Sequence, residues 1–296
     1  MFDLESYLDS KRMLINTHLD KILQNPSNSS RLMEAIHYSL MANGKRLRPV
    51  LCIAAAEVVG GQTEEVLKAA CALEMIHTYS LIHDDLPAMD DDDVRRGKPT
   101  CHIAFDEASA ILAGDALLTL AFQLLSAVEI SNGSQAVTWL RIIHRIADAA
   151  GYRGMIAGQM KDIASETRLL SMEELEELHA LKTGALIEAS IYSGASLGGG
   201  RQEQIDQLGI YAKKIGLAFQ IKDDILNVEG DPALLGKAVG TDKMRQKNTY
   251  PYLMGLEKSK SFAEALVTSA LQAIEPFNRR ADPLRAIANY IVQRNR

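Results

Sequence analysis

The stretch HDDLPAMDDDDVRRGKPT, residues 83–100, gathers six aspartates within ten residues and follows them with Arg95, Arg96 and Lys98. Unit charges about 4 Å apart interact by about 4 kcal/mol at an effective dielectric of about 20, so such carboxylates repel one another unless cations lie between them. Hard oxygen ligands suit magnesium, which commonly takes one or two carboxylates and completes its shell with water and substrate phosphates. Acidic runs also occur as solvated surface, so a metal site and a charged surface loop both remain open.

A helix is predicted directly before this run, and its apolar stripe becomes polar toward the C-terminal end. At steps of three and four, the stripe ends in His77, Ser80 and Asp84. Because buried polar groups without partners are costly, these side chains are expected to face a cavity. A core histidine with satisfied hydrogen bonds is the alternative for His77. Pro87 ends the helix, so Asp90 can return from the loop toward Asp84.

A second acidic motif, FQIKDDILN at residues 219–227, has the pattern of one helical face. Gln220, Asp223 and Asn227 lie at i, i+3 and i+7, and Gly216 leaves room for a close approach one turn earlier. Two acidic helices far apart in the sequence can face each other across a helical bundle, where metal and ligand sites are often built.

Basic residues accompany both acidic motifs. They are Lys45, Arg46 and Arg48 in GKRLRP, the pair Arg95-Arg96, Lys182 in KTG, and Lys237. Arginine forks match the geometry of a diphosphate, and lysine acts as a point charge. Acids for metal beside bases for phosphate indicate a phosphorylated substrate held by bridging metal ions. The long loop 228–248 is interpreted either as a functional lid or as an ordinary solvated loop.

Helical periodicity dominates the rest of the chain, and no alternating strand stands out. The expected helices span residues 3–24, 31–42, 49–60, 63–86, 103–130, 134–162, 171–197, 201–228, 249–275 and 281–294. Length alone would allow two domains, but no shift in composition marks a boundary, so a single all-α domain over residues 1–296 is expected. The formal charge of −6 argues against a general attraction to nucleic acid.

The cellular setting is predicted from the cysteines and the N-terminus. Three cysteines without CxxC pairing fit buried thiols in a reducing compartment better than a disulfide framework. The acidic N-terminus lacks the pattern of a signal peptide, and no segment approaches about eighteen uncharged apolar residues. A cytoplasmic protein without a membrane span is therefore expected.

The ordered motifs GKRLRP, HTYSLIHDDLPAMDDDDVRRGKPTCH, KTG, FQIKDDIL, LGK and NTYP resemble those of the bacterial short-chain trans-prenyltransferases, in particular the farnesyl diphosphate synthases. The match runs through most of the chain, and motifs in this order and at these spacings are highly specific. The resemblance implies the isoprenoid synthase fold, a large all-α bundle around a deep central cavity, and a homodimer. It also implies about three magnesium ions per active site as the cofactor.

The resemblance also implies roles for particular residues. The metal ligands and their supporting carboxylates would be Asp84, Asp85, Asp90, Asp223 and Asp224. The isopentenyl diphosphate site would comprise Lys45, Arg48, His77 and Arg96. The allylic diphosphate site would comprise Arg95, Lys182, Thr183, Gln220 and Lys237. The residues expected to take part in the chemistry are Asp84, Asp90, Asp223, Lys182, Thr183 and Gln220.

The implied reaction joins isopentenyl diphosphate to dimethylallyl diphosphate and then to geranyl diphosphate, giving (2E,6E)-farnesyl diphosphate. Magnesium and cationic side chains would stabilise the leaving diphosphate, and an apolar cavity would keep water from the carbocation. Tyr79 and Ser80, five and four residues before Asp84, match the bacterial C15 pattern, with Tyr79 as the cavity floor. Asn227 stands where the family usually has aspartate, and a higher magnesium requirement is expected from this.

Other functions remain open at this point. A C20 or a C10 diphosphate synthase would use the same chemistry. A terpene cyclase of the same fold would have no need for a second diphosphate site. GKRLRP and His77 indicate such a second site here, so they favour a condensing enzyme over a cyclase. A catalytically silent partner subunit is the alternative outside enzymes, and it would be expected to carry degraded acidic motifs.

Overall fold

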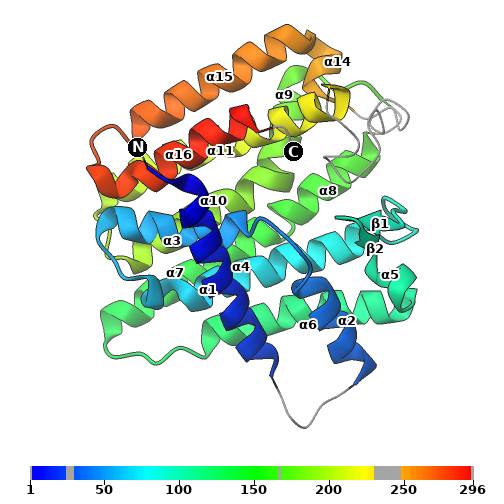
Figure 1. Cartoon of the computed structure of the whole chain (residues 1–296), viewed down its shortest axis with the longest axis horizontal. Coiled ribbons are helices and arrows are strands. Elements are labelled where there is room, and N and C mark those ends of the chain that lie inside the picture. The colour runs from blue at the N-terminus through cyan, green and yellow to red at the C-terminus, as the bar shows by residue number, and fades with distance from the viewer. Residues whose placement is uncertain (1, 25–29, 166–167, 230–247, 295–296) are drawn as a thin grey trace.

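The computed structural model describes residues 2–24, 30–165, 168–229 and 248–294, and it consists almost wholly of helices (Figure 1). The helices of its first half are α1 (Leu4–Leu23), α2 (Arg31–Leu40), α3 (Leu47–Val59), α4 (Thr63–Asp84), α5 (Cys101–Ala104), α6 (Glu107–Ser126) and α7 (Gly133–Ala150). The helices of its second half are α8 (Met155–Ala164), α9 (Met172–His179), the π-helix η1 (Ala180–Gly184), α10 (Ala185–Leu197), α11 (Gln202–Glu229), α14 (Tyr250–Met254), α15 (Leu256–Ala273), the 3-10 turn η2 (Arg279–Ala281) and α16 (Asp282–Gln293).

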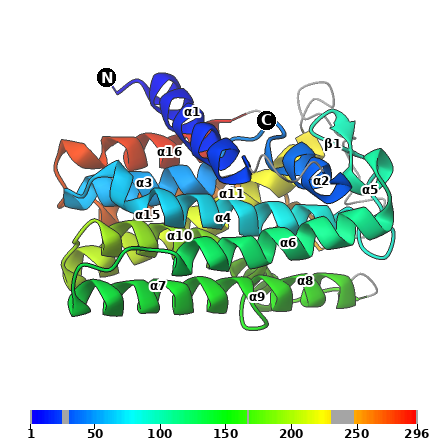
Figure 2. The same cartoon turned by 90° about the horizontal axis from the view of Figure 1, so that it is seen from below.

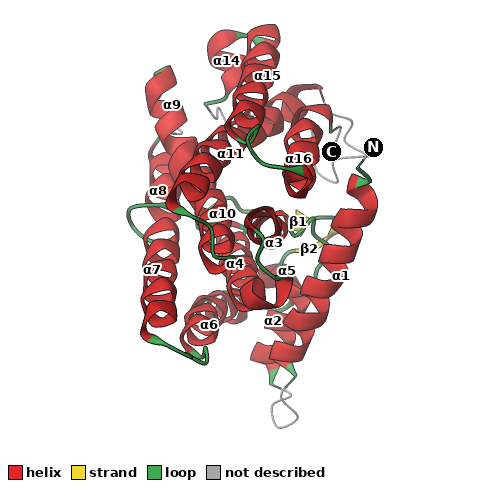
Figure 3. Cartoon of the chain, turned by 90° about the vertical axis from the view of Figure 1, so that its left-hand side faces the viewer, coloured by secondary structure: helices red, strands yellow, loops and turns green. Residues whose placement is uncertain are grey.

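The long helices stack in layers around α3, α4 and α10. Figure 2 shows α7 on one face of the stack and α1 on the opposite face, and Figure 3 shows α3 enclosed by its neighbours. Helix α3 packs against α4 and α10, α4 against α6, and α11 against α15. Every residue from Val50 to Ala56 in α3 is fully buried. Burial of apolar side chains from several helices in one core is what stabilises such a bundle.

Local signals in the sequence account for several helix ends. Ser171 and Glu174 form the predicted capping box, because the Ser171 side chain accepts the Glu174 amide and the Glu174 carboxylate accepts the Ser171 amide. Asn132 caps α7 by accepting the Gln135 amide at 2.9 Å. The three cysteines are buried and free, as predicted.

Four of the predicted helices are interrupted. The segment 103–130 breaks before Asp106, whose carboxylate caps α6, and 134–162 breaks at the turn 151–154. The segment 249–275 breaks at Gly255, which has a φ of 86° that favours glycine. The segment 171–197 passes through η1 without a break in the chain direction. Periodicity alone does not mark these points, because a short break need not interrupt the pattern of apolar residues along the sequence.

A two-stranded antiparallel hairpin, β1 (Val94–Arg95) and β2 (Lys98–Pro99), follows the acidic run and was not expected from the sequence. Its turn uses Arg96 and Gly97 at positive φ, 53° and 74°. The hairpin matters because it carries Arg95 and Arg96 back toward the end of α4.

Helix α6 is long and apolar enough, by length and composition alone, to be a candidate membrane span within the described chain. One such helix is weak support for a membrane protein, and α6 packs against α4 and α2 in the bundle.

Candidate active site

A cavity of about 600 Å³ lies between the C-terminal half of α4, the hairpin, α8, η1 and α11. Eleven of the residues predicted for the site line it, and they come from five separate parts of the chain. They are Arg48, His77, Tyr79, Ser80, Asp84, Arg95, Arg96, Lys182, Thr183, Gln220 and Asp223. The volume lies within the range of ligand cavities in proteins.

The end of α4 provides the first acidic wall. His77, Ser80 and Asp84 line the cavity, as the polar end of the α4 stripe predicts. Burial, opposed by Lys182 and reinforced by Asp90, raises the pKa of Asp84 from 3.8 to about 6. Burial and the neighbouring arginines, Arg48 first, hold the pKa of His77 well below its usual range, so His77 is neutral at pH 7.

Asp85 turns away from the cavity and holds the hairpin. Its carboxylate accepts Arg95 Nε at 2.7 and 3.0 Å and pairs with Arg95 NH2 at 2.6 Å. The Asp85 side chain is only 5% exposed, so this ion pair is largely shielded from water. A carboxylate and a guanidinium fit each other in this two-pronged way, which fixes where Arg95 reaches the cavity. Asp85 therefore supports the site by positioning Arg95.

The two arginines of GKRLRP point in different directions. Arg46 is buried and has a left-handed backbone with a φ of 50°. Its guanidinium donates hydrogen bonds to Glu74 Oε1 at 2.7 Å and to the carbonyl oxygens of Leu40 and Ala42. Its role is structural, because all of these partners lie inside the bundle. Arg48 lines the cavity, where burial lowers its pKa to about 10, so it stays charged at pH 7.

The π-helix η1 carries Lys182 and Thr183 into the cavity wall. π-Helical turns are rare and are often found at functional sites. Lys182 Nζ donates to the Asp162 carboxylate at 2.5 Å, and Thr183 Oγ1 donates to Gln220 Oε1 at 3.1 Å. Helix α8 approaches η1 closely because Gly158 has no Cβ, which would collide with the backbone of Lys182. Asp162 was not singled out from the sequence.

Helix α11 forms the second acidic wall. Asp223 lines the cavity and forms an ion pair with Arg294, the residue that follows α16. Arg294 Nη2 donates to Asp223 Oδ1 at 2.6 Å. The Arg294 guanidinium also lies 4.2 Å from the centre of the Phe219 ring. Asp224 is buried and accepts the Tyr250 amide at 3.1 Å and Gln220 Nε2 at 3.2 Å. Both acidic motifs therefore present their first aspartate to the cavity and keep the second within the protein.

Some predicted residues lie elsewhere. Lys45 lines a neighbouring hollow with Tyr290, on the other side of Phe219. Asp90, Asp224 and Asn227 are not among the residues that line the cavity, and Asn227 is buried in α11. Lys237 and most of the loop 228–248 lie outside the described residues. Their predicted roles stay predictions.

The α8 side of the cavity is mostly apolar. Met155, Ile156, Met160 and Ile163 of α8 line it, together with the polar Gln159. These α8 residues were missed in the sequence, because nothing in a single amphipathic helix tells which distant motif its face will oppose. An apolar wall beside a charged end suits a ligand with a diphosphate head and a hydrocarbon chain.

The charged end suits magnesium by its chemistry. Asp84 is a carboxylate whose burial disfavours its charged form, and a cation would relieve this cost. Within the described ranges, three or more His, Cys, Asp or Glu side chains do not gather at one point. A magnesium ion held by few carboxylates would take its remaining ligands from substrate phosphates and water.

The Polyprenyl synthetase family model matches residues 29–282 of the chain, which include every residue named above that lines the 600 Å³ cavity. The chain belongs to the polyprenyl synthetase family. As a member it is a prenyltransferase of isoprenoid biosynthesis, and its substrates are isoprenoid diphosphates.

Several known members of the family are similar to the chain. The heterodimeric geranylgeranyl pyrophosphate synthase large subunit 1, chloroplastic, of Arabidopsis thaliana is 49% identical over 99% of this chain and 80% of its own length. The geranylgeranyl diphosphate synthase of Cyanophora paradoxa is 45% identical over 99% of this chain and 97% of its own. A crystal structure of an FPP/GFPP synthase from Zymomonas mobilis has a TM-score of 0.85 at 41% identity, and the match covers 98% of both chains.

These comparisons confirm the isoprenoid synthase fold and correct the predicted product. The prediction of a C15 farnesyl product is wrong, because the curated relatives at 49% and 45% identity are geranylgeranyl diphosphate synthases, which make a C20 product. The C15 prediction rested on the resemblance to the farnesyl diphosphate synthases, including the C15 pattern at Tyr79 and Ser80. Tyr79 does line the cavity, but so do residues of α8, and cavity depth depends on both helices.

Proposed function

We propose that this prenyltransferase is a geranylgeranyl diphosphate synthase, which extends an allylic diphosphate with isopentenyl diphosphate to a C20 product. The observation that carries the proposal is the identity of 49% over 99% of the chain with a geranylgeranyl pyrophosphate synthase subunit. The apolar wall of α8 supports it, since a longer hydrocarbon chain needs apolar surface beyond the charged end.

In the proposed site, Asp84, Asp90 and Asp223 hold magnesium, and Asp85 and Asp224 position their surroundings. Magnesium supplies positive charge at the allylic diphosphate as it leaves. Lys182 and Arg95 add charge to the same group, while Thr183 and Gln220 place oxygen dipoles near the carbocation. About three magnesium ions per site are proposed, as in the sequence-based expectation.

Arg48, His77, Arg96 and Lys45 are proposed to hold isopentenyl diphosphate; the first three line the cavity, and Lys45 lines the neighbouring hollow. Neutral His77 serves as a hydrogen-bond donor there rather than as a charge. The allylic carbon–oxygen bond breaks and releases diphosphate, and the double bond of isopentenyl diphosphate attacks the resulting carbocation. One proton then passes to the released diphosphate, which restores a neutral hydrocarbon chain. The apolar lining excludes water, which would otherwise quench the cation.

The decisive experiment is a chain-length analysis of the product. Purified protein is supplied with dimethylallyl diphosphate, labelled isopentenyl diphosphate and magnesium, with a chelator-treated sample as control. A chelator-sensitive C20 product is expected. A product that stops at C15 under excess isopentenyl diphosphate would contradict the proposal, and no product from folded protein would revive the silent-subunit alternative.

Tyr79 provides a second test of the cavity. The variant Tyr79→Ala removes a large side chain from the lining and is expected to move part of the product beyond C20. Thr78→Ala, on the buried neighbour of Tyr79 that does not line the cavity, is the control. An unchanged product distribution in Tyr79→Ala would show that α8 and not α4 limits the chain.

A homodimer is also proposed. Only 33% of the most apolar stretch of α6 is buried, and Ile111 and Leu112 are exposed on that helix. Contiguous exposed apolar surface is typical of interaction sites, and a second copy would cover it. Sedimentation of the purified protein tests this. A single domain over residues 1–296 and a cytoplasmic location stay predictions.

A further inference from the structure

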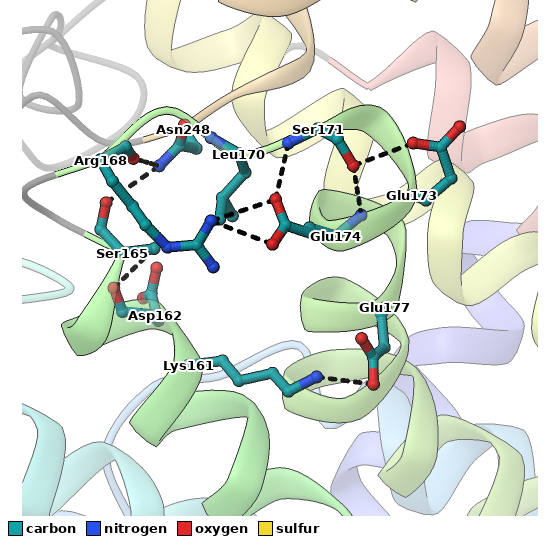
Figure 4. A network of polar contacts seen from close by, with 10 residues as sticks. All are labelled: Lys161, Asp162, Ser165, Arg168, Leu170, Ser171, Glu173, Glu174, Glu177 and Asn248. Carbon is teal, nitrogen blue, oxygen red and sulfur yellow. Dashed lines mark hydrogen bonds and ion pairs between the residues drawn. The ribbon is translucent and has the colours of Figure 1, made fainter.

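A polar network joins the start of the NTYP motif to the turn between α8 and α9 (Figure 4). At its centre, Asn248 Nδ2 donates to the carbonyl oxygens of Ser165 at 3.1 Å and Arg168 at 3.0 Å. Asn248 Oδ1 accepts the Leu170 amide at 2.9 Å. One side chain thus satisfies three backbone groups on a turn about eighty residues earlier in the chain, where a lost bond would leave a backbone group without its partner.

Two residues after Asn248, the same segment also contacts α11. Tyr250 is fully buried, and its amide donates to Asp224. Asp224 in turn accepts from Gln220, and Gln220 accepts from Thr183 at 3.1 Å. A continuous line of hydrogen bonds therefore runs from the backbone of the NTYP motif to a side chain in the cavity wall.

The bonds of Asn248 lead to the cavity by a second route. Ser165 is the C-cap residue of α8, and its hydroxyl donates to the Asp162 carbonyl oxygen at 2.8 Å. The carboxylate of Asp162 holds Lys182 at 2.5 Å. Anchoring the end of α8 thus fixes the carboxylate that places Lys182. The segment 248–250 braces Lys182 through α8 and Thr183 through α11.

We propose that Asn248 is a positioning residue for the allylic diphosphate. Through its hydrogen bonds outside the cavity, it fixes the positions of the Lys182 and Thr183 side chains. This inference rests on the proposed role of Lys182 and Thr183 at that diphosphate. None of the contacts of Asn248 involves Arg48, His77 or Arg96, which lie on α3, α4 and the hairpin. Loss of the brace should therefore affect one substrate and spare the other.

The test compares three variants by steady-state kinetics with geranyl diphosphate and isopentenyl diphosphate varied separately. Asn248→Ala removes all three bonds. Asn248→Asp keeps the size but places an acceptor against two carbonyl oxygens. Lys161→Ala is the matched control, because it breaks an exposed ion pair with Glu177 between the same two helices (Figure 4). Lys182→Met serves as the positive control for the allylic site.

We expect the KM for geranyl diphosphate to rise about tenfold in both Asn248 variants, while the KM for isopentenyl diphosphate changes by less than about twofold. Lys161→Ala should match the wild type. Equal changes in both KM values, or an unchanged KM for geranyl diphosphate while Lys182→Met raises it, would overturn the proposal. If Lys182→Met leaves that KM unchanged, the allylic-site assignment fails, and the proposal falls with it. A C15 product would refute the proposed C20 function without touching this comparison.

Hydrogen exchange keeps the test valid if the variants are unstable. In the wild type, geranyl diphosphate with magnesium should slow exchange at the Leu170 amide, which the brace protects, and isopentenyl diphosphate alone should not. Identical exchange at Leu170 with either substrate would show that the brace does not respond to the allylic site, which would also contradict the proposal.

Discussion

An Asp-Asp pair lies at the end of α4 and another lies in the second half of α11. The first aspartate of each pair faces the cavity, but the two carboxylates have different surroundings. The carboxylate of Asp84 has no hydrogen-bond or ion-pair partner within the described part of the chain, and burial raises its pKa to about 6. Asp223 is already neutralised by Arg294 at 2.6 Å. Among the described residues, the cavity-facing carboxylate of the first wall therefore has no counter-ion in direct contact, whereas that of the second wall has Arg294.

The two second aspartates differ in a related way. Asp85 holds Arg95, which reaches the cavity, and Asp224 accepts the backbone amide of Tyr250 and the side-chain amide of Gln220. The first motif thus places positive charge on the cavity wall, while the second fixes the position of another segment. The same Asp-Asp dipeptide therefore has a different structural role in each motif, because its second residue contacts a different neighbour in each.

The largest effect that would test this comparison is expected from Asp84→Asn. Removing the carboxylate that lacks an internal counter-ion should lower kcat/KM about a thousandfold, since charge stabilisation of this kind is worth about a hundred- to a thousandfold. The control is Asp91→Asn, an exposed aspartate of the same run whose φ of 51° asparagine also tolerates. Equal losses in both variants would mean that the total charge of the run matters and not Asp84.

Asp85→Asn should act mainly on stability. It leaves Arg95 without its bidentate partner, so the free energy of unfolding should fall by about 2 kcal/mol, as for other hydrogen bonds to charged groups. Urea unfolding at pH 7 measures it. Asp84→Asn is the contrast and should not lose stability, because Asp84 has no such partner to lose. Similar losses in the two variants would remove the distinction between a cavity-facing and a supporting carboxylate.

The pH dependence of magnesium binding follows from the raised pKa of Asp84. Its folded-state pKa of about 6 exceeds its ordinary value of 3.8, so the folded protein binds this proton more tightly than the unfolded chain does. The stability that the proton provides is present at low pH and is lost as the pH rises toward about 6. Magnesium must displace this proton, so its affinity should fall about tenfold per unit below pH 6. Calorimetric titration at pH 5 and pH 7 measures this, and equal affinities would contradict the assignment.

The smallest effect concerns Arg294→Gln. Without this guanidinium Asp223 is more available to a metal ion, and the magnesium concentration for half-maximal rate should fall about threefold, as expected for loss of one partly exposed ion pair. Lys260→Gln is the matched control, because Lys260 also pairs with a carboxylate of α11, Glu229 at 2.9 Å, but lies outside the cavity. A higher magnesium requirement in Arg294→Gln would show that the arginine assists the metal site.

The helical faces and the two acidic walls could be predicted from the sequence, because a 3.6-residue period determines which side chains share a face. The polar end of the α4 stripe and the pair Gln220 and Asp223 line one cavity, as expected. The ion pair of Lys182 with Asp162 could not be predicted in this way. It depends on how closely α8 packs against η1, which involves the absence of a side chain at Gly158.

Product length was mispredicted for a similar reason. Tyr79 was assigned its role from the resemblance to the family's C15 pattern, which concerns α4 alone, but residues of α8 also line the cavity. The resemblance assigned Arg48 and not Arg46 to the site, and Arg48 lines the cavity, but the pairing of Arg46 with Glu74 inside the bundle could not be predicted from the motif GKRLRP. Local periodicity identifies faces, and only tertiary packing decides what each face meets.

The π-helical turn η1 has a consequence for how this chain can change in length. A π turn accommodates one residue more than an α-helical turn, and Lys182 and Thr183 lie inside it. Deleting one residue between Ala180 and Gly184 would allow a regular α-helix with α9 and α10 nearly in their present phase, but it would remove the wide turn that carries Lys182 and Thr183. The segment should thus accept many substitutions but no deletion, because its residue count is what aims both side chains at the cavity.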